Sequence, residues 1–136
     1  MWNTIKEFFS RKPRPAPKAA SVSVRSAPDP FAPWVGVDLD GTLAVWDDSS
    51  TLKRIGKPVP GMVEFVNRMV NNGIRVKIFT ARAGDPRQVA MVEKWLRLNG
   101  LPHLEITNVK DYGMQTLYDD RCIQVERNTG RIISEI

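Results

Sequence analysis

Residues 34–43 constrain the fold more than any other stretch, because an apolar run there ends abruptly in two acidic residues followed by glycine. Trp34–Val37 is apolar apart from one glycine that permits close packing, a pattern typical of a short buried strand. Asp38 and Asp40 follow at its carboxyl end, and Gly41 comes directly after them. A chain with this stretch is expected to place two carboxylates at one edge of a sheet.

The spacing of Asp38 and Asp40 has a chemical consequence. In an extended chain, residues two apart point to the same side, so the two carboxylates would lie close together and repel each other. A divalent cation would compensate both charges, and carboxylate oxygens are hard ligands that favour Mg²⁺. Taken alone, these residues also allow a different reading, an acidic surface turn that ends a strand.

The rest of the chain alternates between strand and helix patterns. Apolar residues recur at helical spacing over 62–70, and again from the helix start Asp85-Pro86 as far as Gly100. Further patterns predict strands at 74–80, 104–106 and 116–120, a helical turn near 113–115, and a C-terminal β-hairpin built from 122–126 and 131–134. This alternation predicts an α/β fold of the Rossmann-like type, a parallel sheet with right-handed crossovers flanked by helices.

Polar residues gather where the predicted strands end. Ligands of parallel α/β sheets bind beyond the carboxyl ends of the strands. The residues at or just after those ends are Asp38, Asp40, Thr80, Lys110, Asp119 and Asp120. This set suits phosphoryl transfer, because the charge of a phosphate monoester must be offset and a carboxylate can act as nucleophile. Arg82 is expected either to bind a second phosphate or a nucleotide, or to pair with Asp85.

Four short motifs, in this order, resemble those of the haloacid dehalogenase-like (HAD) hydrolase superfamily. They are Asp38-Leu39-Asp40-Gly41-Thr42, Ile78-Phe79-Thr80, Lys110 and Asp119-Asp120, and the resemblance covers residues 34–126. The first motif is specific, whereas the others gain weight from their order. The chain is most similar to small phosphatase-like members encoded by bacteriophages and bacteria, and more loosely to the phosphatase half of polynucleotide kinase/phosphatases. The resemblance implies a HAD-type sheet.

The resemblance also implies a role for each site residue. Asp38 would be the nucleophile and would form an aspartyl-phosphate. Asp40 would protonate the leaving oxygen and then deprotonate the hydrolytic water, and its backbone carbonyl would bind Mg²⁺. Asp38 together with one or both of Asp119 and Asp120 would complete the protein ligands of the metal. Thr80 and Lys110 would hold the phosphoryl oxygens, and an aspartate at position 40 suits a phosphatase.

The sequence leaves no room for the cap domain that many members of this superfamily carry. An irregular flap (41–60), helices and strands fill the segments between the motifs. An open site suits a bulky substrate such as a nucleic-acid end or a protein, or a site closed by a partner subunit. We therefore expect Mg²⁺-dependent hydrolysis of a phosphomonoester, with a nucleotide or polynucleotide end as the preferred substrate.

The first 33 residues differ in composition from the rest. We expect a short amphipathic helix at 1–10, a proline-rich basic linker at 11–33 and the HAD-like domain at 34–136. Residues 1–33 hold six basic and two acidic residues, whereas the rest holds fourteen and thirteen, so the basic character does not mark the domain as a nucleic-acid binder. The alternative function is a HAD-fold binding module, recruited by the helix to a protein or membrane surface, with little or no turnover.

Several classes are excluded by what the chain lacks. No apolar run approaches the roughly 20 residues that a transmembrane helix needs, and a single histidine, His103, rules out a two-histidine metal site. The one cysteine, Cys122, cannot form an intrachain disulfide and is expected to be a buried, inert thiol. We expect a cytoplasmic protein of a bacterium or of a bacterial host. Three further residues are expected to be structural or solvated: Asp47, Asp48 and Arg121.

Overall fold

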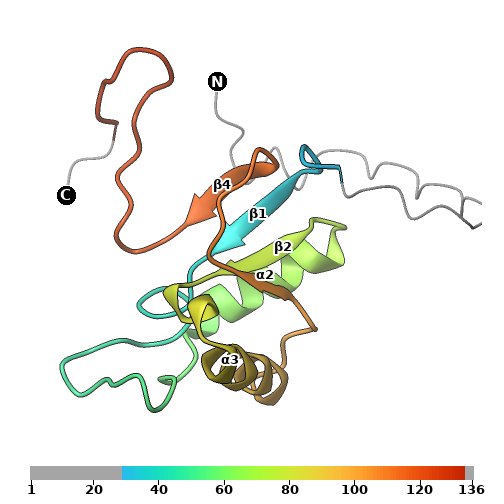
Figure 1. Ribbon diagram of the computed structural model, residues 1–136, viewed down its shortest axis with the longest axis vertical. Coiled ribbons are helices and arrows are strands. Elements are labelled where there is room, and N and C mark those ends of the chain that lie inside the picture. Colours follow the sequence, from blue (N-terminus) through green and yellow to red (C-terminus); the bar gives the residue numbers. More distant parts are fainter. Residues whose placement is uncertain (1–28, 134–136) are drawn as a thin grey trace, which may run out of the picture.

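The computed structural model describes residues 29–133 and has four short strands there, the first three of which are separated by helices (Figure 1). The elements are β1 (Trp34–Val37), α2 (Pro60–Asn71), β2 (Val76–Phe79), the 3-10 helix η1 (Ala81–Gly84), α3 (Pro86–Leu98), β3 (Glu105–Thr107) and β4 (Met114–Tyr118). The predicted helix at 1–10 and most of the predicted linker lie outside the described residues. The domain boundaries therefore remain predictions.

The four strands form one sheet in the order β3-β2-β1-β4, and every pairing is parallel. In the centre, Val37 lies opposite Ile78 of β2 on one side and Tyr118 of β4 on the other. The predicted Rossmann-like α/β arrangement is confirmed. Because all strands run the same way, the residues that follow β1, β2 and β4 emerge at the same edge of the sheet.

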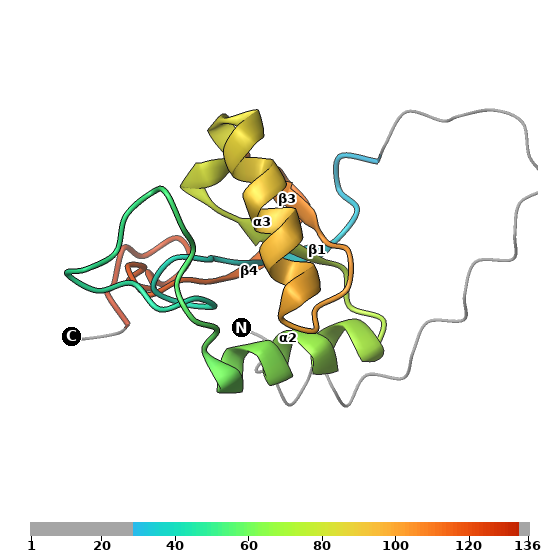
Figure 2. The ribbon, with the colours of Figure 1, turned by 90° about the horizontal axis from the view of Figure 1, so that it is seen from below.

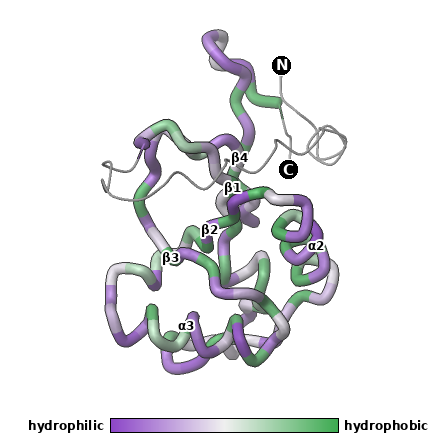
Figure 3. Tube along the Cα trace, turned by 90° about the vertical axis from the view of Figure 1, so that its right-hand side faces the viewer, coloured by the Kyte–Doolittle hydropathy of each residue, from purple (hydrophilic) through white to green (hydrophobic). Residues whose placement is uncertain are grey.

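Both α-helices pack against one face of this sheet, and Figure 3 shows them on the same side of the row of strands. Pro60 opens α2, and the carboxylate of Asp85 accepts a hydrogen bond of 2.9 Å from Arg87 N at the start of α3. The shared core draws on both helices and both central strands: Val66, Met69, Val92, Trp95, Leu96, Val35, Val37, Val76 and Ile78. Burying each such side chain contributes about 1.5–3 kcal/mol, so this core holds the strand ends in place.

The opposite face carries a separate set of side chains. Lys77 Nζ lies 4.4 Å from the ring centroid of Trp34, and the Trp34 indole donates a hydrogen bond of 2.7 Å to Asp111 Oδ1. Asp111 belongs to the loop that connects β3 to β4. A turn at 112–113 leads directly into β4, so the helical turn expected near 113–115 is wrong: those residues begin a strand instead.

The C-terminal hairpin is smaller than expected. As far as residue 133, where the described chain ends, the hairpin has a single antiparallel bridge, between Val125 and Ile132, and a turn at 127–129 with a positive φ of 66° at Asn128. This arm extends away from the sheet in Figure 1, and Cys122 at its base is exposed. The prediction of a buried thiol is therefore wrong, because the apolar residues of 122–126 have no sheet to pack on.

The flap at 41–60 is irregular, as expected, apart from two single bridges that Ala44 makes with Asp40 and Pro58. Figure 2 shows it as a long loop beyond the carboxyl end of β1. Among residues 29–133, neither helix is long and apolar enough to cross a bilayer.

Candidate active site

Three carboxylates meet at the carboxyl edge of the sheet. Asp38 directly follows β1 and donates its backbone N–H to Tyr118 O at 2.9 Å, which ties it to the end of β4. Asp119 and Asp120 follow β4 immediately. One carboxylate oxygen from each of Asp38, Asp119 and Asp120 lies within 4.8 Å of the others. We call these three residues the acidic cluster. The register of neighbouring parallel strands explains why residues some 80 positions apart come together.

Asp38 is the buried member of the acidic cluster, with only 7% of its surface exposed. Burial, with a further contribution from the charge of Asp119, raises the pKa of Asp38 from 3.8 to about 7. Among the described residues, its Oδ2 is the one buried side-chain oxygen without a hydrogen-bond partner. A buried acceptor with no donor, beside two other carboxylates, fits a hard divalent cation such as Mg²⁺.

Gly41 and Thr42 hold Asp120 in this arrangement. Thr42 Oγ1 donates to Asp120 Oδ1 at 3.1 Å and accepts from Asp120 N at 3.0 Å. Gly41 has a φ of 90°, and a Cβ there would lie 2.5 Å from Asp120 Oδ2. Only glycine suits this position, for its conformation and for its size. Both residues belong to the first motif, but their supporting contact with Asp120 was not foreseen.

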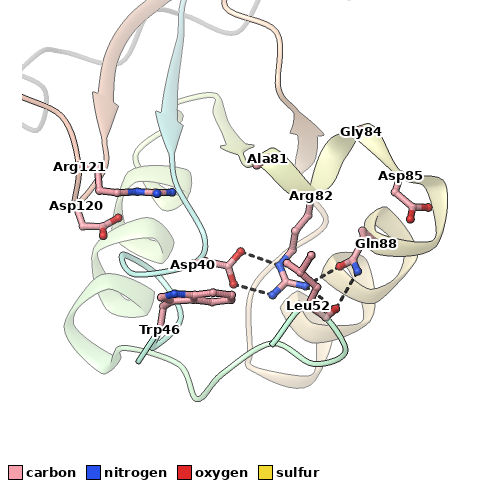
Figure 4. Close-up of a pocket in the computed structure, with 10 residues that line it drawn as sticks. All are labelled: Asp40, Trp46, Leu52, Ala81, Arg82, Gly84, Asp85, Gln88, Asp120 and Arg121. Atoms are coloured by element: carbon pink, nitrogen blue, oxygen red, sulfur yellow. Dashed lines mark hydrogen bonds and ion pairs between the residues drawn. The ribbon is translucent and has the colours of Figure 1, made fainter. Parts of the chain in front are cut away.

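Asp40 lies outside the acidic cluster, because its carboxylate is bound to Arg82. Arg82 Nε donates to Asp40 Oδ2 at 2.7 Å, and Nη2 donates to Oδ1 at 2.9 Å (Figure 4). The remaining N–H groups of Arg82 donate to Gln88 Oε1 at 2.6 Å and to the carbonyls of Leu52 and Arg54 at 3.3 Å. The arginine is 4% exposed, and all five of its donors are taken by the protein.

This geometry bears on two expectations for Arg82. It does not pair with Asp85, which caps α3 instead. In this arrangement Arg82 has no free N–H group left for the predicted contact with a second phosphate or a nucleotide. Arg82 joins Asp40, α3 and the flap, and neither its partner nor its burial is visible in the local sequence.

Thr80 and Lys110 differ in how closely they approach the site. Thr80 directly follows β2, is buried, and accepts a hydrogen bond of 3.2 Å from Arg82 N. Its hydroxyl still has a proton to donate. Lys110 is exposed on the loop after β3. The pKa of Cys122 is raised by partial burial of the thiol and by the nearby acidic cluster, and the positive charge of Lys110 offsets part of this increase. Within residues 29–133, no hydrogen bond or ion pair joins Lys110 to the acidic cluster.

A cavity of about 590 Å³ opens beside Asp40 (Figure 4). The flap contributes Trp46 and Leu52, and the segment after β4 contributes Asp120 and Arg121. Neither Trp46 nor Leu52 was among the expected site residues, although a tryptophan in an irregular polar segment is a visible signal. Arg121 lines the cavity. Asp47 accepts hydrogen bonds from the Ser49 hydroxyl at 2.6 Å and from Ser49 N at 2.9 Å, and these bonds lower the pKa of Asp47.

No family model, no curated protein and no solved structure matches this chain. The α/β fold and the geometry of the acidic cluster therefore stand on the structure alone. The likeness to HAD hydrolases stays a prediction from the four motifs.

Proposed function

We propose that the protein is a Mg²⁺-dependent phosphatase of the HAD type that hydrolyses a phosphomonoester through an aspartyl-phosphate on Asp38. The main support is Asp38 Oδ2, a buried oxygen that has no hydrogen-bond partner within residues 29–133 and lies beside Asp119 and Asp120. Such an oxygen costs about 1–3 kcal/mol unless a ligand binds it. Asp38, Asp119 and Asp120 would hold the cation, together with the backbone carbonyl of Asp40.

Bound Mg²⁺ would offset the negative charge of both the carboxylates and the phosphoryl group. In the first step, an oxygen of Asp38 forms a bond to phosphorus while the bond from phosphorus to the leaving oxygen breaks. The Thr80 hydroxyl donates a hydrogen bond to a phosphoryl oxygen. Lys110 supplies positive charge when its flexible side chain reaches the site. In the second step, water attacks phosphorus, the bond to Asp38 breaks, and phosphate leaves.

Arg82 donates two hydrogen bonds to the Asp40 carboxylate and so fixes its orientation. In the first step, Asp40 would give a proton to the leaving oxygen. In the second step, it would take a proton from the attacking water.

The direct test is hydrolysis of p-nitrophenyl phosphate with Mg²⁺, with EDTA, and after Mg²⁺ is added back in excess. We expect activity that EDTA abolishes and Mg²⁺ restores. Asp38→Asn should lower the rate at least 10³-fold, because the amide is a poor nucleophile. The matched control is Asp48→Asn, which changes an exposed aspartate in the flap. Activity that survives in Asp38→Asn, or that ignores EDTA, contradicts the proposal.

A cytoplasmic location in a bacterium or bacterial host is part of the same proposal. It is supported by the single cysteine and by the resemblance to phage and bacterial phosphatases.

A further inference from the structure

The cavity beside Asp40 has features that removal of a phosphoryl group does not require. Trp46 and Leu52 are 46% and 62% exposed, although both are large apolar side chains. In Figure 4 the indole ring of Trp46 lies under the Asp40 carboxylate, and Leu52 lies beside Arg82. Exposed apolar surface that lines a concave site next to polar groups is typical of a ligand pocket.

The cavity borders the proposed phosphoryl site. Asp40 and Asp120 both line it, and Asp120 is a member of the acidic cluster. Its volume of about 590 Å³ lies within the range of roughly 300–1,000 Å³ that small-molecule pockets occupy. A substrate whose phosphoryl group reaches Asp38 can therefore place its leaving group in the cavity.

Arg121 adds a charge to the same cavity. Its backbone N–H donates to Asp119 Oδ1 at 2.8 Å, but within the described residues its guanidinium has no hydrogen bond or ion pair. Arg82, in contrast, has no donor to spare. Arg121 is thus the guanidinium that can approach oxygen or nitrogen acceptors of a ligand, while Trp46 offers a flat aromatic face.

We infer that the cavity binds the base of a nucleoside monophosphate, stacked on Trp46, while the phosphoryl group lies at Asp38. The inference rests on the proposed function. A planar base has a π-face for Trp46 and acceptor atoms for Arg121, whereas a sugar phosphate lacks the π-face. A polynucleotide end is less well suited, because residues 34–136 carry only fourteen basic against thirteen acidic residues and so attract a polyanion weakly.

The test compares kcat/KM for adenosine 5′-monophosphate and for ribose 5-phosphate, which share the ester and differ in the base. We expect the wild-type protein to prefer the nucleotide. Trp46→Ala should lower that preference about tenfold or more, the size expected for one lost stacking contact, whereas Trp46→Phe should keep most of it. Tyr112→Ala removes an aromatic side chain that is 84% exposed outside the cavity and should leave the preference unchanged.

Two outcomes overturn the inference while the phosphatase proposal stands. One is an unchanged preference in Trp46→Ala. The other is a wild-type protein that hydrolyses a 5′-phosphorylated oligonucleotide more efficiently than the mononucleotide.

If the wild-type protein hydrolyses no phosphomonoester, the proposed function has failed, and calorimetric titration with adenosine 5′-monophosphate decides the inference. Binding that weakens about tenfold in Trp46→Ala supports the nucleotide site. Equal binding by both proteins, or none by either, overturns it.

Discussion

Asp38 and Asp40 are separated by one residue, yet their carboxylates have opposite surroundings. Asp38 is buried and lies beside two other acidic groups, and one of its oxygens has no hydrogen-bond partner in the described part of the chain. Asp40 accepts two short hydrogen bonds from one guanidinium. The difference arises from their neighbours: β4 brings acidic residues to Asp38, whereas the turn after β2 brings Arg82 to Asp40.

This contrast shows how one short motif can supply two different chemical groups. A carboxylate that lacks a positive partner in the protein is suited to bind a cation and to react. A carboxylate that accepts two hydrogen bonds from one arginine is fixed in its orientation, which suits a group that must take a proton from a positioned water. A pair of acidic residues with different surroundings is characteristic of active sites in which the two residues have different catalytic roles. Four substitutions can test this division.

The largest effect is expected from Asp40→Asn, which keeps the size of the side chain but removes its ability to take a proton. Loss of a general base typically slows a reaction by about 10²–10⁴-fold. With p-nitrophenyl phosphate, whose leaving group needs no proton, the first step should still proceed and the second should stall. Rapid-mixing measurements should then show a burst of about one equivalent of p-nitrophenol.

The control for this experiment is Asp38→Asn, which should show no burst because no aspartyl-phosphate can form. A steady-state rate in Asp40→Asn equal to that of the wild-type protein would refute the base role. A slow rate with no burst would show that Asp40→Asn slows the first step, which contradicts a role of Asp40 as the base of the second step alone.

The next largest effect is on stability, from Arg82→Ala. Breaking a buried ion pair by removing one partner costs about 3–5 kcal/mol, and here the flap carbonyls of Leu52 and Arg54 lose a donor as well. Urea unfolding should show a decrease of this size in the free energy of unfolding. Arg87→Ala, at a side chain that is 93% exposed, should change it by less than about 0.5 kcal/mol. If both substitutions lowered the free energy of unfolding equally, the hydrogen bonds of Arg82 would not be important for the stability of the fold.

The sequence predicted Asp38 in the acidic cluster but not the partner of Asp40, and the reason is geometric. Asp38, Asp119 and Asp120 are placed by strand ends, and strand ends can be predicted from apolar runs. Arg82 is placed by a 3-10 turn and by backbone carbonyls of an irregular flap, neither of which leaves a pattern in residue types. Trp46 is visible in the sequence as a tryptophan in an irregular polar segment, but no local pattern indicates that it lines a cavity.

Cys122 illustrates a different limit. The apolar residues around it resemble a strand, and a strand is normally buried when it has a sheet to join. β4 ends at Tyr118, and the following arm forms only one bridge with itself among the described residues. An apolar pattern indicates that a segment can form a buried strand, but it does not show whether a sheet lies close enough for that strand to join.

A third substitution, Asp38→Asn, tests the surroundings of Asp38 through the free energy of unfolding, measured in EDTA so that no metal is bound. The pKa of Asp38 is about 7 in the folded protein, against the ordinary value of 3.8 for an aspartate, so the folded state binds more protons between these values. The wild-type protein should therefore lose stability as pH rises from about 4 to 7, by about 1–4 kcal/mol. Asp38→Asn removes this charge, so its advantage over the wild-type protein should be absent at pH 4 and present at pH 8.

Thermal unfolding in EDTA at the two pH values measures this difference, and Asp48→Asn serves as the control. Added Mg²⁺ should raise the midpoint of the wild-type protein at pH 8 by more than that of Asp38→Asn. A variant that is less stable than the wild-type protein at both pH values would show that Asp38 is not destabilised by its surroundings.

The smallest effect is expected from Thr42→Val, which preserves shape but removes the hydroxyl that both donates to and accepts from Asp120. The fold should lose about 1–3 kcal/mol, because each of the two hydrogen bonds contributes about 0.5–1.5 kcal/mol. Because Thr42 orients a proposed ligand and contributes no ligand atom itself, the affinity for Mg²⁺ should fall about tenfold. Thr42→Ser keeps the hydroxyl and should restore most of that affinity. If Thr42→Val weakened the fold but left the Mg²⁺ dependence of activity unchanged, Asp120 would not bind the metal, and Asp38 would share the cation with Asp119 alone.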